Sequence, residues 1–121
     1  MSNIILDKSF QFSVASVKYY RKAIKNNEHV ILNQYLRSAT SIGANVREAQ
    51  HAQSKKDFIN KMSIALKEAN ESEYWLKLLM ESNIKEYNSK EINYLLNECI
   101  EINKILFSLI KTSKKFINNK R

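Results

Sequence analysis

The stretch ATSIGANVREAQ, residues 39–50, contains the only glycine in a chain of 121 residues that has no proline. Hairpins and βαβ units need these two residue types in their turns, so a sheet has almost nothing to be built from. Hydrophobic residues make up 44% of the chain, which excludes general disorder, and the length suits one folding unit. The sequence therefore predicts an all-α protein with a single domain over residues 1–121.

Apolar residues recur every three or four positions in four segments of the chain, which is the pattern of amphipathic helices. The expected helices span about residues 8–26, 29–51, 55–83 and 90–117. Asp7, Ser54 and Ser89 are the expected N-caps, and Asp57 stands three residues after Ser54 as in a capping box. Short connections between the segments predict an antiparallel, up-down-up-down four-helix bundle.

Each expected helix carries an apolar stripe for a common core. On the first helix this stripe consists of Phe10, Val14, Val17 and Ile24. The other three stripes consist of Leu32, Tyr35, Leu36, Ala39, Ile42, Gly43 and Val46; of Phe58, Ile59, Met62, Ala65, Leu66, Ala69, Leu76 and Met80; and of Ile92, Leu95, Leu96, Cys99, Ile102, Leu106, Leu109, Ile110 and Ile117.

Two of the helices have a second apolar face outside these stripes. The additional residues are Phe12, Tyr19 and Ala23 on the first helix and Ile64, Trp75 and Leu78 on the third. A homo-oligomer that uses the outer faces of these two helices would remove them from water. Scattered surface aromatics are the alternative interpretation.

Gly43 falls on the core side of the second helix, one turn after Ala39. An interior glycine costs a helix up to about 1 kcal/mol relative to alanine, so close approach of a neighbouring backbone is the expected compensation. Ala65 and Ala69 are small and core-facing, and we expect them to pack against Ala39 and Gly43. A phosphate-binding glycine loop would need several glycines after a strand, and neither is present.

The same region carries a family resemblance. The stretch RSATSIGANVREAQHAQSKKDFINKMSIALKEANESEYWLKLL, residues 37–79, resembles the signature of the small four-helix-bundle family named for intervening sequences in 23S rRNA genes, and SLIKTSKK (108–115) extends the likeness more loosely. The resemblance implies a left-handed four-helix bundle that assembles as a ring-shaped homopentamer. It also implies kinship with the accessory variability determinant proteins of diversity-generating retroelements, which bind nucleic acid and a reverse transcriptase.

The polar part of this signature, Asn45, Arg47 and Glu48, leaves two interpretations open. These side chains could contact a ligand or partner, or they could form hydrogen bonds between helices or subunits. The structural interpretation is favoured because a helical oligomer needs such pairs to set its register. The candidate partners are Lys67, Glu68 and Glu71.

Catalytic chemistry finds little support in the sequence. Glu48 and His51 have the E-x-x-H spacing of di-iron bundles, but such sites need two of these motifs and two further inward-facing glutamates. His29 and His51 are the only histidines, too few for a convincing triad or zinc site. Cys99 is expected to be a small buried hydrophobe. We therefore expect a non-enzyme without metal or cofactor.

The expected location is the cytoplasm. A single cysteine cannot form an internal disulfide, which fits a reducing compartment. The apolar run that precedes Asp7, residues 4–6, has only three residues, too few for a signal peptide, and no apolar stretch is long enough to span a membrane.

The charge of the chain is +8 and is unevenly distributed. Residues 68–101 contain eight acids and three bases, whereas no acid follows Lys104. The candidate nucleic-acid-binding residues form a stripe on the first helix and a group near the C-terminus. They are Lys18, Arg21, Lys22 and Lys25, followed by Lys111, Lys114 and Lys115.

A ring of identical subunits would repeat this positive surface and present it to a polyanion. The sequence thus favours binding of RNA or DNA through phosphate contacts, with little sequence preference and with a nucleic-acid-processing protein as a further partner. The alternative is a protein-interaction scaffold whose positive charge only aids solubility. A membrane-surface module is disfavoured because the basic residues do not accompany a lipid-facing apolar stripe on a lone helix.

Overall fold

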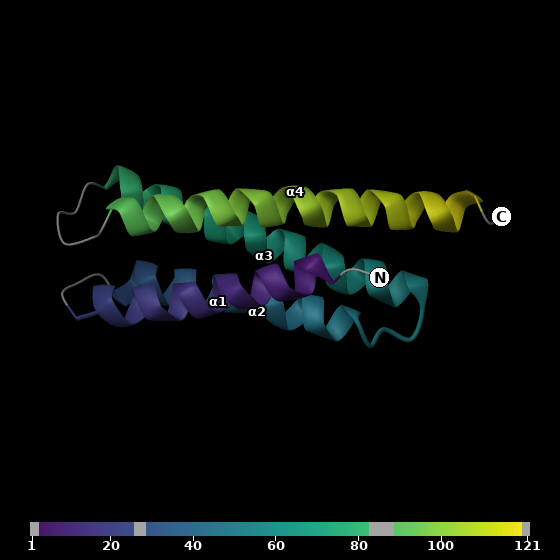
Figure 1. Cartoon of the computed structure of the whole chain (residues 1–121), viewed down its shortest axis with the longest axis horizontal. Helices are drawn as coiled ribbons and strands as arrows, with labels where there is room; N and C mark the ends of the chain where they lie inside the picture. Colours follow the sequence, from purple (N-terminus) through teal and green to yellow (C-terminus); the bar gives the residue numbers. More distant parts are fainter. Residues whose placement is uncertain (1–2, 26–28, 83–88, 120–121) are drawn as a thin grey trace.

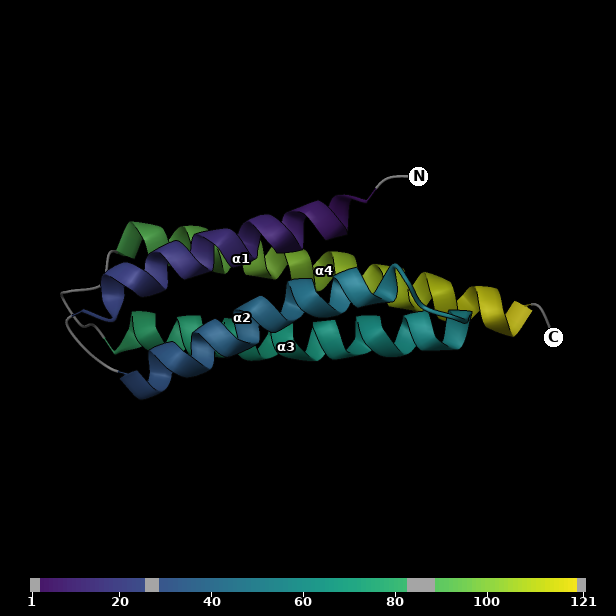
Figure 2. The ribbon, with the colours of Figure 1, turned by 90° about the horizontal axis from the view of Figure 1, so that it is seen from below.

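The computed structural model describes residues 3–25, 29–82 and 89–119 of the chain. It contains four helices and, among these residues, no strand. The helices are α1 (Ile4–Ala23), α2 (His29–Ala49), α3 (Lys55–Glu81) and α4 (Ser89–Asn119). Each helix packs against the next in the chain, and α1 packs against α4, which closes an up-down-up-down four-helix bundle (Figures 1 and 2).

The first helix begins earlier than the sequence predicted. Asp7 is not the N-cap, because α1 starts at Ile4 and the Asp7 N–H donates to the Asn3 carbonyl over 3.0 Å. Burial of Ile5 in the core explains this start, because a helical turn at these residues places its apolar side chain against the core. Asp7 still lies in the first turn, where a carboxylate interacts favourably with the helix dipole.

The predicted cap of α3 is confirmed. The Ser54 hydroxyl accepts the Asp57 N–H over 3.0 Å. The Asp57 carboxylate accepts the Gln53 N–H over 3.4 Å, one residue before the donor of an ordinary capping box. Ser89 is the first residue of α4, and its predicted capping side chain lies outside the described residues.

The core stripe predicted for the first helix was wrong. Phe12 and Tyr19 are each only 2% exposed and lie in the core, whereas Phe10 is 60% exposed. The residues of α1 that are buried are Ile5, Ser9, Phe12, Ser16, Tyr19 and Ala23. The remaining members of the predicted stripe, Val14, Val17 and Ile24, are half-buried.

Two serines explain this error. Ser9 and Ser16 interrupt the buried stripe with residues that hydropathy counts as polar, although both are fully buried. Their hydroxyls are satisfied, because Ser9 donates to the Leu6 carbonyl over 3.2 Å and Ser16 shares a 2.7 Å hydrogen bond with the Tyr35 hydroxyl. Phe12 and Tyr19 are therefore unavailable for the oligomer interface proposed from the sequence.

The stripes predicted for the other three helices lie toward the core, with Leu32, Tyr35, Met62 and Leu106 among their fully buried members. A second polar pair is buried between α2 and α3, where the Ser38 and Ser72 hydroxyls lie 2.8 Å apart. Hydropathy does not predict either serine as a core residue.

Gly43 allows a close helix contact, as predicted, but with a different partner. A methyl group at this position would lie 3.1 Å from the Ser13 hydroxyl oxygen and 3.3 Å from the Ser9 carbonyl oxygen, both on α1. The predicted pairing of Gly43 with Ala65 and Ala69 on α3 was therefore wrong. Gly43 lies on the side of α2 that faces α1, and a helical wheel cannot say which of two neighbours a core-facing residue approaches.

Gly43→Ala is expected to lower the free energy of unfolding by about 1 kcal/mol. Alanine improves helix propensity by about 1 kcal/mol, but its methyl group would press on the Ser9 backbone, and overpacking costs about 1–3 kcal/mol. Urea unfolding followed by far-UV circular dichroism measures the change. Ala44→Gly, at the exposed next position, measures propensity alone and is expected to cost about 1 kcal/mol. A Gly43→Ala variant stabilised by that same amount would contradict the close contact.

Candidate nucleic-acid interface

The basic residues of α1 form an exposed group at the end of that helix. Lys18, Arg21, Lys22 and Lys25, here called the α1 patch, all lie on the surface. Lys22 forms an ion pair with Glu91 at the start of α4 over 3.2 Å. No carboxylate among the described residues forms an ion pair with the other three, so most of the positive charge of this patch is uncompensated there.

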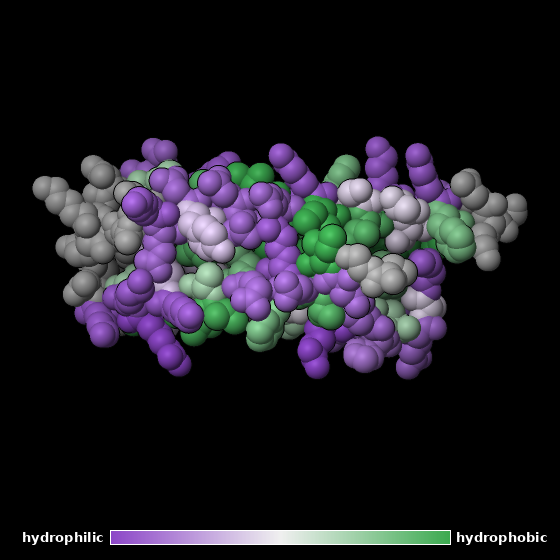
Figure 3. Space-filling view, in the orientation of Figure 1, coloured by the Kyte–Doolittle hydropathy of each residue, from purple (hydrophilic) through white to green (hydrophobic). Residues whose placement is uncertain are grey.

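The basic residues of α4 lie at the opposite end of the bundle. Lys111, Lys114 and Lys115, here called the α4 patch, are exposed in the last turns of that helix, beside the start of α3 (Figure 1). Figure 3 shows hydrophilic side chains standing out at both places, over the end of α1 and over the second half of α4. The seven candidate residues therefore form two separate patches and not one continuous surface.

The sequence analysis missed two further cations beside the α4 patch. Lys55 and Lys56 begin α3, and the Lys55 ammonium lies 5.2 Å from the Phe116 ring centroid on α4 and 5.6 Å from that of Phe58. Two adjacent lysines after the Ser54 cap were the available signal, because the up-down topology brings this helix start to the end of the last helix.

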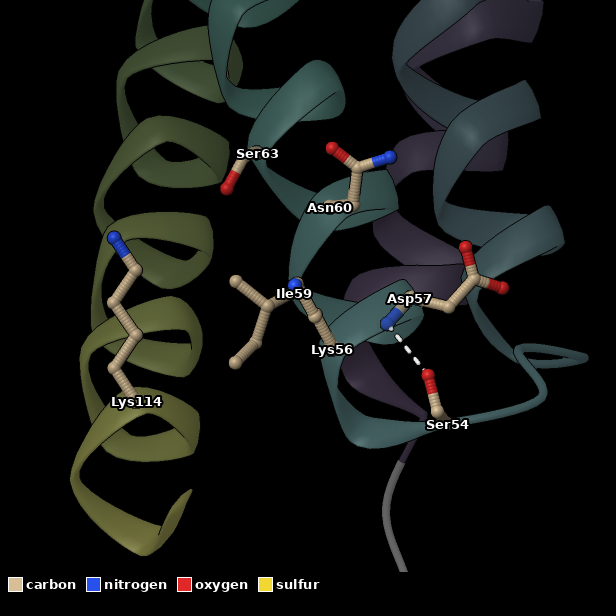
Figure 4. A pocket seen from close by; sticks show the side chains of 7 residues that line it. All are labelled: Ser54, Lys56, Asp57, Ile59, Asn60, Ser63 and Lys114. Atoms are coloured by element: carbon tan, nitrogen blue, oxygen red, sulfur yellow. Dashed lines mark hydrogen bonds between the residues drawn. The ribbon is translucent and has the colours of Figure 1, made fainter. Parts of the chain in front are cut away.

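A polar hollow of about 500 Å³ lies between the start of α3 and the end of α4. It is lined by Ser54, Lys56, Asp57, Ile59, Asn60, Ser63 and Lys114 (Figure 4). In Figure 4, Ile59 and Ser63 point from α3 toward the helix that carries Lys114, whereas the Asp57 carboxylate points to the other side. Positive charge therefore dominates the mouth of this hollow.

Most of the acidic residues are engaged away from the two patches. Lys8 of α1 contacts Glu98 over 2.6 Å and Glu101 over 2.8 Å on α4, and these glutamates raise the pKa of the Lys8 ammonium. Arg37 of α2 binds Glu68 and Glu71 of α3, and its hydrogen bond lowers the pKa of the Glu71 carboxyl. These contacts pair Lys8 and Arg37 with glutamates, whereas Lys22 is the one cation of the two patches that forms an ion pair among the described residues.

Two of the three polar signature residues form contacts within the chain. The Asn45 amide donates to the Ser41 carbonyl over 2.9 Å, and Glu48 forms a 3.0 Å ion pair with Lys61 that links α2 to α3. Arg47 is exposed beside Gly43 in a hollow of about 320 Å³ between α1 and α2. Their candidate partners Glu68 and Glu71 bind Arg37 instead. This pairing depends on the register of α2 against α3, which the sequence alone does not give.

Three of the five predicted interface residues remain available on the outer side of α3. Ile64 is exposed, and Trp75 and Leu78 are half-buried. The Trp75 indole donates to Glu71 over 3.2 Å and packs its ring edgewise against Tyr74, with centroids 5.0 Å apart. The Trp75 ring also packs partly against the core, so only part of it remains at the surface.

No metal-binding cluster is assembled among the described residues. Glu48 and His51 are both exposed, and the described part of the chain holds no group of three or more His, Cys, Asp or Glu side chains that could bind a metal ion. Cys99 is fully buried and its thiol donates to the Ala69 carbonyl over 3.3 Å. Burial raises the pKa of this thiol to about 12, so the nucleophilic thiolate is disfavoured.

These features define a class of protein, the small four-helix bundle with a buried apolar core and exposed basic patches. The chain belongs to the 23S rRNA-intervening sequence protein family, whose model matches residues 1–108. It is similar to a crystal structure from Bacteroides thetaiotaomicron, described as a protein of unknown function from the S23 ribosomal protein family. The two sequences are 49% identical, and the two structures superpose with a TM-score of 0.83. The match covers 89% of this chain and 99% of the Bacteroides chain.

Among curated proteins none matches this chain. Within the described residues, no helix is both long enough and apolar enough to cross a membrane.

Cys99 is expected to resist thiol reagents in the folded protein and to react once the protein unfolds. Its folded pKa of about 12 lies above the ordinary value, so the thiolate is scarce at neutral pH and its population rises only as the pH approaches that value. Labelling with Ellman's reagent near neutral pH, with and without urea, measures the difference. Rapid stoichiometric labelling of the folded protein would contradict the buried, structural role.

Proposed function

We propose that this protein is a non-enzymatic, homo-oligomeric, cytoplasmic protein that binds RNA or DNA through phosphate contacts from its two basic patches. The observation that carries this proposal is the distribution of ion pairs. Lys8, Arg37 and Lys61 are each paired with glutamate, whereas all but Lys22 in the α1 and α4 patches lack an ion pair among the described residues. Unpaired exposed lysines attract a polyanion and release its counterions on binding.

The binding proposed here has little sequence preference. Lysine and arginine on exposed helix faces contact phosphate oxygens, which carry no direct sequence information. The kinship with accessory variability determinant proteins that the family resemblance implies favours a role beside a nucleic-acid-processing enzyme such as a reverse transcriptase.

The proposed oligomer uses the outer side of α3. Ile64, Trp75 and Leu78 are apolar residues that a second copy of the chain could cover. The family resemblance favours a pentameric ring, in which each basic patch is repeated around the symmetry axis. Repetition strengthens an attraction that is modest for a single patch.

Binding of labelled single-stranded and duplex oligonucleotides is expected to weaken steeply between about 50 and 200 mM salt. Replacing Lys18, Arg21, Lys22 and Lys25 by glutamine should lower the slope of log affinity against log salt by up to about 3.6 for the duplex, since each phosphate contact contributes about 0.9. Fluorescence anisotropy measures both effects. Lys67→Gln together with Lys77→Gln, outside both patches, is the control. No binding of the unmodified protein at low salt would overturn the proposal and favour the protein scaffold.

Trp75→Glu is expected to reduce the particle mass while helicity survives, because a buried charge at a contact between copies is costly. Light scattering measures the mass and circular dichroism the helicity. Tyr94→Glu introduces the same charge at an exposed aromatic residue of α4 and should leave the mass unchanged. Equal masses for the Trp75→Glu variant and the parent protein would exclude Trp75 from the interface.

A further inference from the structure

The hollow beside Lys114 is one of two on the α3–α4 pair. A second hollow of about 280 Å³ is lined by Leu66, Asn70, Asn103, Lys104 and Phe107. Ile59 and Lys114 line the first hollow, whereas Leu66 and Phe107 line the second, seven residues along each antiparallel helix. The two hollows are therefore about 10 Å apart along one helix pair. Together they are called the α3–α4 groove.

The α4 side of this groove carries three cations and one aromatic ring. Lys104, Phe107, Lys111 and Lys114 are spaced by three or four residues, so they lie along one face of the helix. All four are exposed, and they extend over about 15 Å at 1.5 Å per residue. No carboxylate of the described chain forms an ion pair with these three lysines.

The α3 side supplies an apolar floor and a polar rim. Ile59 and Leu66 are half-buried and pack against the core, while Asn60 and Asn70 are exposed. Lys56 adds a cation at one end of the groove. At the other end the Asn103 amide donates to Glu73 over 3.0 Å and to the Ala69 carbonyl over 3.4 Å. The groove is therefore electropositive along its length, and the acidic residue Glu73 marks its far end.

The α4 helix is long enough that part of this groove lies beyond the start of α1. Lys8 contacts Glu98 and Glu101, and since the two helices are antiparallel, the start of α1 at Ile4 lies beside about residue 104 of α4. The last turns of α4 extend beyond this level (Figure 2). Lys111 and Lys114 therefore have only α3 as a neighbouring helix.

Phe107 is the least expected residue of this surface. Its ring is 60% exposed, although a phenyl group usually gains from burial. The rings of Phe58 and Phe116 each face the Lys55 ammonium, but no described residue stacks on the Phe107 ring. Its face is open between two flanking lysines.

We propose that the α3–α4 groove binds a single-stranded segment of nucleic acid, with phosphates on Lys104, Lys111 and Lys114 and one base stacked on Phe107. This inference rests on the proposed function and specifies its ligand. An electropositive groove with an exposed aromatic ring matches the two contacts that single strands make, since phosphates follow the cations and an unpaired base offers its face to the ring. In a duplex the bases are stacked on one another, so Phe107 would gain nothing.

The first test uses the full-length protein and fluorescence anisotropy with a labelled oligothymidine of about twelve nucleotides and a duplex of the same length. Phe107→Ala should weaken single-strand binding about tenfold and leave duplex binding unchanged. Phe107→Trp should preserve single-strand binding because its ring can stack. Tyr94→Ala, an exposed aromatic residue of α4 outside the groove, is the matched control and should change neither affinity.

The second test compares equal losses of charge in the α3–α4 groove and in the α1 patch. Replacing Lys104, Lys111 and Lys114 by glutamine should lower the single-strand salt slope by about 2, at about 0.7 per phosphate contact. Replacing Lys18, Arg21 and Lys25 by glutamine removes the same charge from the other end of the bundle and should lower that slope less.

The outcomes separate this inference from the proposed function. If the unmodified protein binds neither oligonucleotide at low salt, both fall. If it binds but Phe107→Ala and Tyr94→Ala behave alike, or both triple variants have equal slopes, the groove assignment is overturned while the proposed function stands. If Phe107→Ala lowers the particle mass in light scattering, the groove is a contact between copies and the assignment is likewise overturned.

Discussion

The close approach of α1 to α2 at Gly43 is the constraint on which the arrangement of the first helix depends. The Ser9 carbonyl and the Ser13 hydroxyl occupy the space that a side chain at position 43 would fill. In this arrangement Phe12, Tyr19 and the two buried serines, Ser9 and Ser16, face the core. The same orientation leaves Phe10 and the α1 patch on the surface, so the packing of one backbone against another determines what the helix presents to solvent.

The charge distribution follows from the same bundle geometry. Antiparallel neighbours bring Lys8 to Glu98 and Arg37 to Glu68, so these charges find partners. Such exposed pairs contribute modestly to stability, but they remove acids that could have neutralised the patches. The ends of the bundle retain their positive charge, and this separation supports both the proposed binding and its division between two sites.

The α4 patch also lies at the edge of the family likeness. The family match ends at residue 108, so Lys111, Lys114 and Lys115 belong to a part of α4 that it does not cover. Phe107 and Lys104 lie just within the matched range. The α3–α4 groove therefore combines residues inside the family match with cations from the final turns of α4, which lie outside it.

The sequence by itself determined the all-helical class, because a chain with one glycine and no proline lacks turn residues for a sheet. It also determined the α3 cap at Ser54 and the need for a close contact at Gly43. Only the tertiary structure decided which face of α1 is buried, which helix Gly43 approaches, and that the basic residues form two patches. The physical reason is that hydropathy describes one helix at a time, whereas a serine becomes a core residue, and a lysine stays unpaired, only through its neighbours on other helices.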